Sequence, residues 1–397
     1  MLGSGMNSAA VTWYILQATH SEVSLAALVV LQTIPAMLMM PFSGVLIDRE
    51  DRRRLVMILD AGRALIILGV AVLALRGEVA LWHLYAMNIL VSAGFWMFWP
   101  TITALIQELT PDTEYAHANA FLMAGVQGGW LIAGGIVGFI YNTVGLSGVL
   151  LIDFCTYLLS FLCYLGVRKG RHVVAQVHHH HVDKSAVSRF FHEMREGFVY
   201  LRTEPRLVLL GITWALFIGG MMTQNVVGAP VSERLLHAGA VGYGWLNAGW
   251  GVGAFLSAVA AARLLPKLGS ARVIVVCMLV LAISLSALPF SRWLAVAVAC
   301  FFAAGAARGI GGVALTSSMM EIVPKHFMGR VQNAFALAAT ALQVSLSPIV
   351  GMMAHRWSLT AAILLIGGCY GAALFTALRF ARTPHVQLAY EVADEIR

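Results

Sequence analysis

Hydrophobic and polar positions alternate along this chain on the scale of whole helices. Long apolar runs, most near the ~20 residues that a helix needs to cross a bilayer, are separated by short polar stretches and by one long basic stretch near the middle. The runs are Met1–Thr19, Val23–Ile47, Leu55–Leu75, Leu81–Ile106, Asn119–Tyr141, Leu146–Val167, Leu207–Gly228, Gly242–Leu264, Val273–Phe290, Trp293–Ser317, Val331–Met353 and Thr360–Leu378. The pattern predicts an all-α integral membrane protein of twelve transmembrane helices, six on each side of a central loop.

Composition excludes a soluble fold. The 397 residues are 59% hydrophobic and 11% charged, whereas soluble domains carry about 25% charged residues. The net charge of +7 does not indicate a nucleic-acid partner, because loop Lys and Arg in a membrane protein set its orientation and meet anionic lipid. We find no nucleotide-binding loop and no catalytic constellation, so we expect neither enzyme activity nor a cofactor.

The basic residues lie predominantly on one side of the predicted membrane. Of the 26 Lys and Arg, twenty fall in the tail and in the loops that share a side with the termini, and four fall in the opposite loops. The positive-inside rule therefore places both termini in the cytoplasm of a multi-pass protein of the cell membrane. We expect the bacterial inner membrane.

The two halves repeat each other. Glu108–Pro111 leads to Asn119-Ala120-Phe121, and Glu321–Pro324 leads to Asn333-Ala334-Phe335. This repetition predicts two parallel six-helix halves with a substrate site at their interface. The predicted parts are an N-terminal half (1–167), a cytoplasmic central loop with an amphipathic helix (168–206), a C-terminal half (207–380) and a cytoplasmic tail (381–397).

The loop from Gly44 to Arg54 concentrates charge between two apolar runs. It resembles the signature loop of the major facilitator superfamily, G-x-x-x-D-R/K-x-G-R-R/K, with Asp51 in the place of the second glycine. The form D-R-x-D-R-R is similar to the branch of drug:proton antiporters that includes macrolide-efflux proteins and siderophore exporters. The resemblance implies that this loop is a cytoplasmic gate, although topology-setting charge alone is the simpler alternative.

The gate prediction covers the loop and the helix that follows it. Asp60 and Arg63 are three residues apart, so they can pair on one helix face. The gate residues expected are Gly44, Asp48, Arg49, Arg52, Arg53, Asp60 and Arg63.

Polar and aromatic residues in the predicted spans are candidates for the substrate cavity. The resemblance implies that the first, fourth, seventh and tenth spans line it. The candidates are Asn7, Gln17, Trp96, Trp99, Gln127, Trp214, Gln224, Asn225 and Arg308.

Two charged residues in the spans raise the question of proton coupling. An Arg at the depth of Arg308 costs at least ~2.5–3.5 kcal/mol on insertion scales, so it contacts either an anionic group in a cavity or a carboxylate that fixes packing. Asp153 is either a proton site or a side chain that snorkels to the outer interface. Asn7 stands where relatives often have an acid, which argues against a proton site on the first span.

Three further features carry weaker predictions. Gly134, Gly135 and Gly138 resemble part of the glycine-rich antiporter motif and predict close helix packing. The run His178–His181 is more simply solvated than metal-binding, and we expect no metal. Gly3, Gly5 and Asn7 come very early in the first span, so we expect the sequence to lack about a turn or two of that helix.

These patterns together predict a secondary active transporter that works by alternating access. The expected activity is proton-coupled efflux of an amphipathic organic compound, such as a drug, macrolide or siderophore, by a monomer surrounded by membrane lipid. An importer or symporter, or a lysophospholipid-type flippase, on the same fold is the alternative.

Overall fold

The computed structural model describes residues 1–49, 51–110, 115–167, 204–323 and 328–383, with Arg195 and Leu201. Within the helices, some side chains are outside this description, including those of residues 36–49 and of Gln127. The run His178–His181, most of the predicted amphipathic helix and the predicted tail from residue 384 onward also lie outside the described residues.

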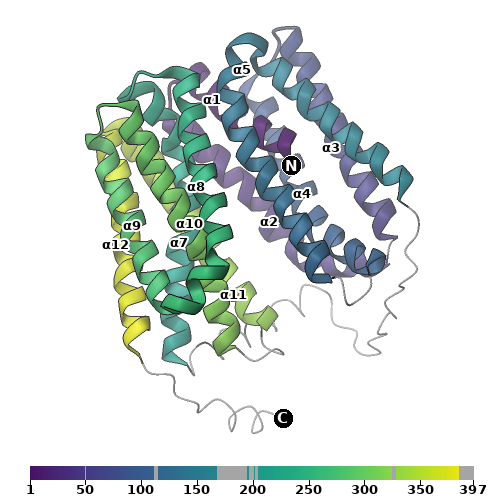
Figure 1. The fold of residues 1–397 in the computed structure, drawn as a ribbon. Helices are drawn as coiled ribbons and strands as arrows, with labels where there is room; N and C mark the ends of the chain where they lie inside the picture. Colours follow the sequence, from purple (N-terminus) through teal and green to yellow (C-terminus); the bar gives the residue numbers. More distant parts are fainter. Residues whose placement is uncertain are drawn as a thin grey trace. The chain divides into compact units, whose positions relative to one another are not determined.

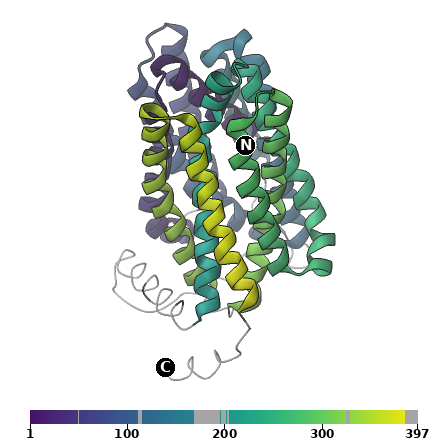
Figure 2. The same ribbon diagram turned by 90° about the vertical axis from the view of Figure 1, so that its left-hand side faces the viewer.

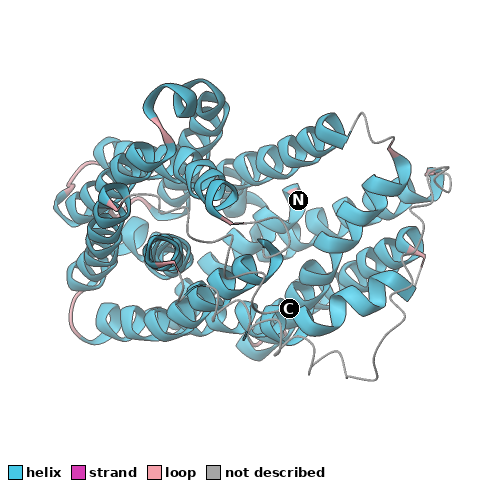
Figure 3. Ribbon diagram, turned by 90° about the horizontal axis from the view of Figure 1, so that it is seen from below, coloured by secondary structure: helices cyan, strands magenta, loops and turns pink. Residues whose placement is uncertain are grey.

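The described residues form helices joined by short turns, and no strand occurs among them (Figure 3). Each predicted apolar run lies largely within a helix. The α-helices are α1 (Leu2–Thr19), α2 (Glu22–Arg49), α3 (Arg52–Leu75), α4 (Leu81–Leu109), α5 (Tyr115–Gly166), α7 (Pro205–Pro230), α8 (Gly239–Leu268), α9 (Ser270–Ala287), α10 (Leu294–Ile322), α11 (Met328–Arg356) and α12 (Leu359–Arg382). A π-helical turn, Val231–Leu235, extends α7, and a 3-10 turn, Leu288–Phe290, extends α9. Eight helices in the described part of the chain are long and apolar enough to cross a membrane.

The long helix α5 contains two of the predicted spans. Its backbone departs from helical geometry at Gly145, where φ is 66° and ψ is −171°. A side chain is strongly disfavoured in that region of φ and ψ, so glycine allows the chain to change direction there. The segments before and after Gly145 correspond to the predicted spans Asn119–Tyr141 and Leu146–Val167.

The chain divides into two compact units (Figure 1). The first contains α1 to α5 together with Gly239–Ala248 of α8, and the second contains α7, the rest of α8 and α9 to α12. In the first unit α1 and α3 pack on α5, and α3 packs on α4. In the second, α7 and α9 pack on α12, and α9 packs on α10; Figure 2 shows α12 in yellow beside α7 in teal. The pairing of helices in the second unit therefore parallels that in the first.

Glycines allow α8 and α10 to approach closely within the second unit. A Cβ atom at Gly305 would collide with the backbone carbonyl of Trp250, and one at Gly309 would collide with that of Ala254. Small residues are favoured at helix contacts in membranes because they let backbones come together. The obstacle here is backbone, which cannot rotate away as a side chain can.

We expect Gly305→Ala to lower the stability of the protein by about 1–3 kcal/mol, the usual cost of overpacking. Gly368→Ala on α12 is the matched control, because a Cβ there meets nothing within 4 Å, and we expect a change within about 0.5 kcal/mol. The measurement is the midpoint of unfolding of the purified protein in detergent. Equal midpoints for the two variants would contradict the α8–α10 contact.

Candidate functional site

Among the described residues of the first unit, four charged side chains are buried. Glu22, the first residue of α2, is one of them, and the other three lie farther inside their helices. Asp153 on α5 is 0% exposed, Asp60 on α3 is 1% exposed and Arg63 on α3 is 3% exposed. All three lie on helices that span the membrane, where water cannot satisfy a charge and a partner must do so. Their partners therefore define the candidate site.

The guanidinium of Arg63 is enclosed by partners. It forms an ion pair with Asp60, donates to the hydroxyl of Tyr157 at 3.4 Å and donates through Nε to the carbonyl of Leu59 at 3.2 Å. Its central carbon lies 4.7 Å from the ring centroids of both Phe98 and Tyr157, within cation–π range. This ion pair is the one that the spacing of the two residues predicted.

Both oxygens of the Asp60 carboxylate are occupied. Arg63 takes Oδ1, and the hydroxyl of Ser160 on α5 donates to Oδ2 at 2.6 Å. A buried ion pair is stabilising only when further hydrogen bonds satisfy what remains of each charge. The Asp60–Arg63 pair meets that condition and joins α3 to α5.

Asp153 has hydrogen-bonding partners but, among the described residues, no ion pair with a cationic side chain. The side-chain amide of Asn7 on α1 donates to Oδ2 at 2.8 Å, and the hydroxyl of Thr156 lies 3.4 Å from Oδ1. Among the described residues, no Lys or Arg side chain lies within ion-pair distance of this carboxyl. The snorkelling alternative for Asp153 is wrong, because the side chain is fully enclosed between α5 and α1.

The two carboxyl groups belong to one buried polar stripe. Asp153, Tyr157 and Ser160 lie at i, i+4 and i+7 of α5, on one helix face, and Ser4 of α1 bonds the hydroxyl of Tyr157 at 2.9 Å. The polar atoms therefore run from Asn7 and Asp153 through Tyr157 to Arg63 and Asp60. We call this set of side chains the polar stripe.

Sequence reasoning singled out the charged members of the polar stripe and missed its hydroxyl groups. No role for Ser4, Thr156, Tyr157 or Ser160 was predicted from the sequence. Two of them repeat with Asp153 at helical spacing along α5. A search for polar positions at i, i+4 and i+7 from Asp153 would have found Tyr157 and Ser160.

Arg308 lies in the second unit, on α10, and is half-buried. Its Nε donates to the sulfur of Met221 on α7, and its central carbon is 5.9 Å from the ring centroid of Phe217. Neither partner carries a negative charge. Within the described residues Arg308 has no ion pair with a carboxylate.

The other predicted cavity residues differ in burial within their own units. Asn7 belongs to the polar stripe, Gln224 is buried, Trp99 and Trp214 are half-buried, and Trp214 lies 6.2 Å from the ring of Phe335. The exposed candidates are Gln17, Trp96 and Asn225. Gln127 lies outside the described side chains.

The side chains of the charged loop are described from Asp51 onward, and the backbone from Gly44 to Arg49 is the end of α2. Asp51 caps α3 by accepting from the backbone N–H of Arg54 at 3.1 Å. Arg53 donates to the carbonyls of Tyr164 and Leu165 at 2.8 and 2.7 Å, where the end of α5 leaves acceptors free. Arg52 begins α3, and the side chains of the remaining gate residues Gly44, Asp48 and Arg49 are not among those described.

The glycines of α5 face the first part of α8 within the first unit. A Cβ atom at Gly138 would collide with the backbone of Gly244, one at Gly134 would lie 3.0 Å from Asn247 Cβ, and one at Gly135 would lie 3.4 Å from Ala248 Cβ. These positions therefore serve close helix packing. Across the described residues, no group of three or more His, Cys, Asp or Glu could hold a metal ion.

Comparison with known proteins shows that this chain is similar to membrane transporters. The profile of the Major Facilitator Superfamily matches residues 1–332. The MFS-type transporter YkuC of Bacillus subtilis is 23% identical over 361 residues, covering 87% of this chain and 81% of the relative. BacE of the same species, named as a bacilysin exporter, is 28% identical over 243 residues, covering 59% and 56%. Macrolide efflux protein A of Streptococcus pyogenes is 21% identical over 230 residues, covering 57% and 54%.

Solved structures share the fold at lower identity. A POT family transporter in complex with a thioalcohol-conjugated peptide has a TM-score of 0.74 at 13% identity, with 96% of this chain and 93% of that chain covered. A D-xylose–proton symporter has a TM-score of 0.69 at 17% identity, with 96% and 95% covered. At these identities the likeness concerns the fold.

The buried ion pair gives a test by double substitution. We expect Asp60→Asn and Arg63→Met each to destabilise the protein by about 3–5 kcal/mol, because each leaves a buried charge without its partner. The double variant should cost less than the sum of the two, by about 0.5–3 kcal/mol. The measurement is the midpoint of unfolding in detergent.

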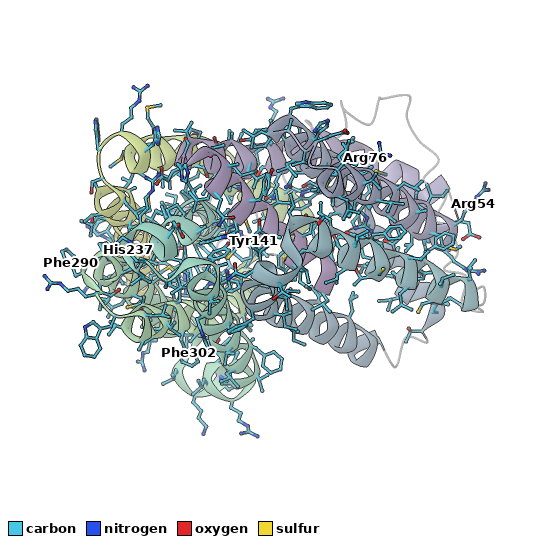
Figure 4. The ribbon with its side chains drawn as sticks, turned by 90° about the horizontal axis from the view of Figure 1, so that it is seen from above. Arg54, Arg76, Tyr141, His237, Phe290 and Phe302 are labelled. Carbon is cyan, nitrogen blue, oxygen red and sulfur yellow. The ribbon has the colours of Figure 1, made fainter. Side chains whose placement is uncertain are left out.

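Arg54→Met is the control for that cycle. Arg54 lies on the same helix but is exposed, and its side chain projects away from the ribbon (Figure 4). We expect a change within about 0.5 kcal/mol. Strict additivity of the two single substitutions would show that Asp60 and Arg63 do not interact energetically.

Proposed function

The chain belongs to the major facilitator superfamily, and we propose that within it this multi-pass membrane protein is a proton-coupled exporter of amphipathic organic compounds. It works by alternating access, through twelve membrane helices in two six-helix halves. The observation that carries the proposal is the enclosed carboxyl of Asp153, which has hydrogen-bonding partners but no cation of Lys or Arg beside it among the described residues.

A carboxyl in that setting is suited to exchange a proton. An ionised carboxylate without a paired cation is costly to bury, whereas the neutral acid keeps its bond with Asn7 and loses no partner. When the site opens toward water, hydration lowers the free energy of the ionised carboxylate, and the proton leaves Oδ1 or Oδ2. One proton binding and one proton release at Asp153 then accompany each cycle.

Asp60 has the opposite role in this proposal. Its charge is balanced by Arg63 and its second oxygen is held by Ser160, so it stays ionised and fixed. The Asp60–Arg63 pair and Tyr157 therefore hold α1, α3 and α5 together while Asp153 exchanges its proton.

Export is favoured over import by the sequence relatives. Those that share more than 20% identity over half of this chain include BacE and Macrolide efflux protein A, whose names state export. The transporters whose names state uptake, such as the D-xylose–proton symporter, share the fold at 17% identity. Import is therefore the alternative to the proposed export.

The direction of transport depends on orientation. Twenty of the 26 Lys and Arg lie in the tail and the loops on one side, and the positive-inside rule assigns that side to the cytoplasm. The charged loop with Arg53 at the end of α5 is then a cytoplasmic structure. It serves the proposed gate by holding α3 to α5 on that side.

We expect Asp153→Asn to abolish the response of transport to a pH gradient, because an amide cannot take up or release the proton. The measurement uses proteoliposomes loaded with a pH-sensitive dye, with bacilysin as the probe because BacE is named for its export, and records proton movement when the probe is added. Transport driven by an imposed pH gradient should fall at least 10-fold. Exchange of labelled for unlabelled probe, which needs no net proton transfer, should remain.

Glu78→Gln is the matched control, since it also neutralises a carboxyl but lies exposed at the opposite end of α3 from the charged loop. It should behave like the wild type. A wild-type protein that moves the probe at the same rate with and without the pH gradient would exclude proton coupling. An Asp153→Asn variant with an unchanged gradient response would exclude Asp153 as its site.

Cargo and direction are tested in cells. Bacteria expressing the gene should accumulate less of an exported compound than cells carrying the empty vector, and should tolerate more of it, across a panel that includes macrolides and bacilysin. Higher accumulation of a panel member would favour uptake instead. The experiment measures intracellular label and growth inhibition side by side.

A further inference from the structure

We infer that Arg308 binds a carboxylate group of the transported compound. This inference rests on the proposed function, because it names the chemistry of the cargo, but it depends on neither the direction nor the coupling of transport. The guanidinium of Arg308 lies within a membrane helix and, in the described part of its unit, forms no ion pair.

Arg308 lies near the middle of a membrane helix. It is on α10, which runs from Leu294 to Ile322, so about 20 Å of helix separates it from either end. The side chain cannot reach water at the helix ends over that distance. A charge at this depth faces a cavity or a partner.

The groups around the guanidinium are neutral. The thioether of Met221 is a weak acceptor, and the ring of Phe217 lies at 5.9 Å, near the limit of cation–π range. On the side of the next helical turn stands Gly312, where a Cβ would lie 3.4 Å from Nη1. The absence of a side chain at Gly312 leaves space beside the guanidinium.

Among the described residues of the second unit, no carboxylate forms an ion pair with Arg308. Glu204, just before α7, is seventeen residues along the chain from Met221, which is about 25 Å on a helix. Between Pro205 and Thr383 the sequence contains only Glu233 and Glu321 as acidic residues. Both are exposed, and Glu233 follows the far end of α7, in its π-helical turn. Glu321 is thirteen residues along α10 from Arg308, about 20 Å away, and accepts from Ser270 at 3.4 Å.

Arg63 shows what a structural arginine looks like in this protein. Its guanidinium has a carboxylate, a hydroxyl, a carbonyl and two aromatic rings around it. The embedded carboxyls of the first unit, Asp60 and Asp153, have partners within that unit. Arg308 lacks such a set, although both arginines lie in the middle of a membrane helix.

The neighbourhood suits a ligand with an acidic end and an apolar body. A carboxylate accepts two parallel hydrogen bonds from a guanidinium. A carboxylate on the ligand would supply the negative charge that the described side chains around Arg308 do not provide. The aromatic residues Phe217 and Tyr370 lie next to each other, since the hydroxyl of Tyr370 bonds the Phe217 carbonyl at 3.5 Å. Both rings are 1% exposed, so they form a packed apolar wall beside the charge, and the half-buried Met221 is the apolar side chain next to the guanidinium.

The test compares two probes of one shape that differ in charge. Dansylglycine carries a carboxylate, and dansylglycinamide replaces it with a neutral amide. Binding to the purified protein in detergent is followed by energy transfer from tryptophan to the dansyl group. We expect the wild type to bind dansylglycine at least 10-fold more tightly than dansylglycinamide.

Substitution then assigns the preference to one side chain. We expect Arg308→Gln to reduce the preference to less than twofold, and Arg308→Lys to keep part of it, since the charge remains but the planar fork is lost. Arg356→Gln, which removes an exposed arginine at the end of α11, should keep the full preference. Each variant is first checked for a monodisperse profile in size-exclusion chromatography.

Two results would overturn the inference. The first is equal affinity of the wild type for both probes, which needs no variant and would mean that a protein carboxylate already neutralises Arg308. The second is a preference that survives in Arg308→Gln. Because binding is measured without any gradient, a failure here is separate from a failure of proton coupling or of export.

Discussion

A lipid bilayer provides no water to its interior, so every charge placed there must find its partner within the protein or in a ligand. The Asp60–Arg63 pair is the constraint on which the rest of the first unit depends. Satisfying it fully requires Ser160 and Tyr157 of α5, and Tyr157 in turn bonds Ser4 of α1. One ion pair therefore fixes how three membrane helices lie against one another.

The two units share a pattern of helix pairing but differ in their embedded charge. Deep in its membrane helices the first has two buried carboxyl groups and one buried guanidinium, whereas the guanidinium of Arg308 has no acidic partner in the described part of the second. This difference is the basis of the proposed division of roles on one repeated architecture, with proton exchange at Asp153 and recognition of the cargo at Arg308. Similar packing makes both units stable, while these few side chains separate their functions.

Close backbone contact is what brings the polar groups together. A Cβ at Gly3 would collide with Asp153 and Thr156, and one at Gly94 would lie 2.9 Å from Arg63 Cδ. Glycine at these two places lets α1 approach the carboxyl and lets α4 accommodate the arginine. The same device, at Gly305, packs α10 on α8 in the second unit. Glycines in this protein thus allow the buried polar side chains to reach their positions as well as allowing helices to pack closely.

The sequence by itself determined the class of protein and the extent of its helices, because apolar runs near the thickness of a bilayer admit little else. It also identified Asp60 with Arg63 as a pair, since residues three apart on a helix meet without help from the fold. Only the tertiary structure decided that Asp153 is enclosed beside Asn7, 146 residues away in the chain, and that Tyr157 bonds both Arg63 and Ser4. Contacts between helices depend on how each helix is rotated about its axis, and hydrophobicity on all sides of a membrane helix conceals that rotation. For Arg308 both sources contribute. The sequence shows that it lies near the middle of an apolar run with no acidic residue close in the chain, and the structure adds that the side chains around its guanidinium are neutral.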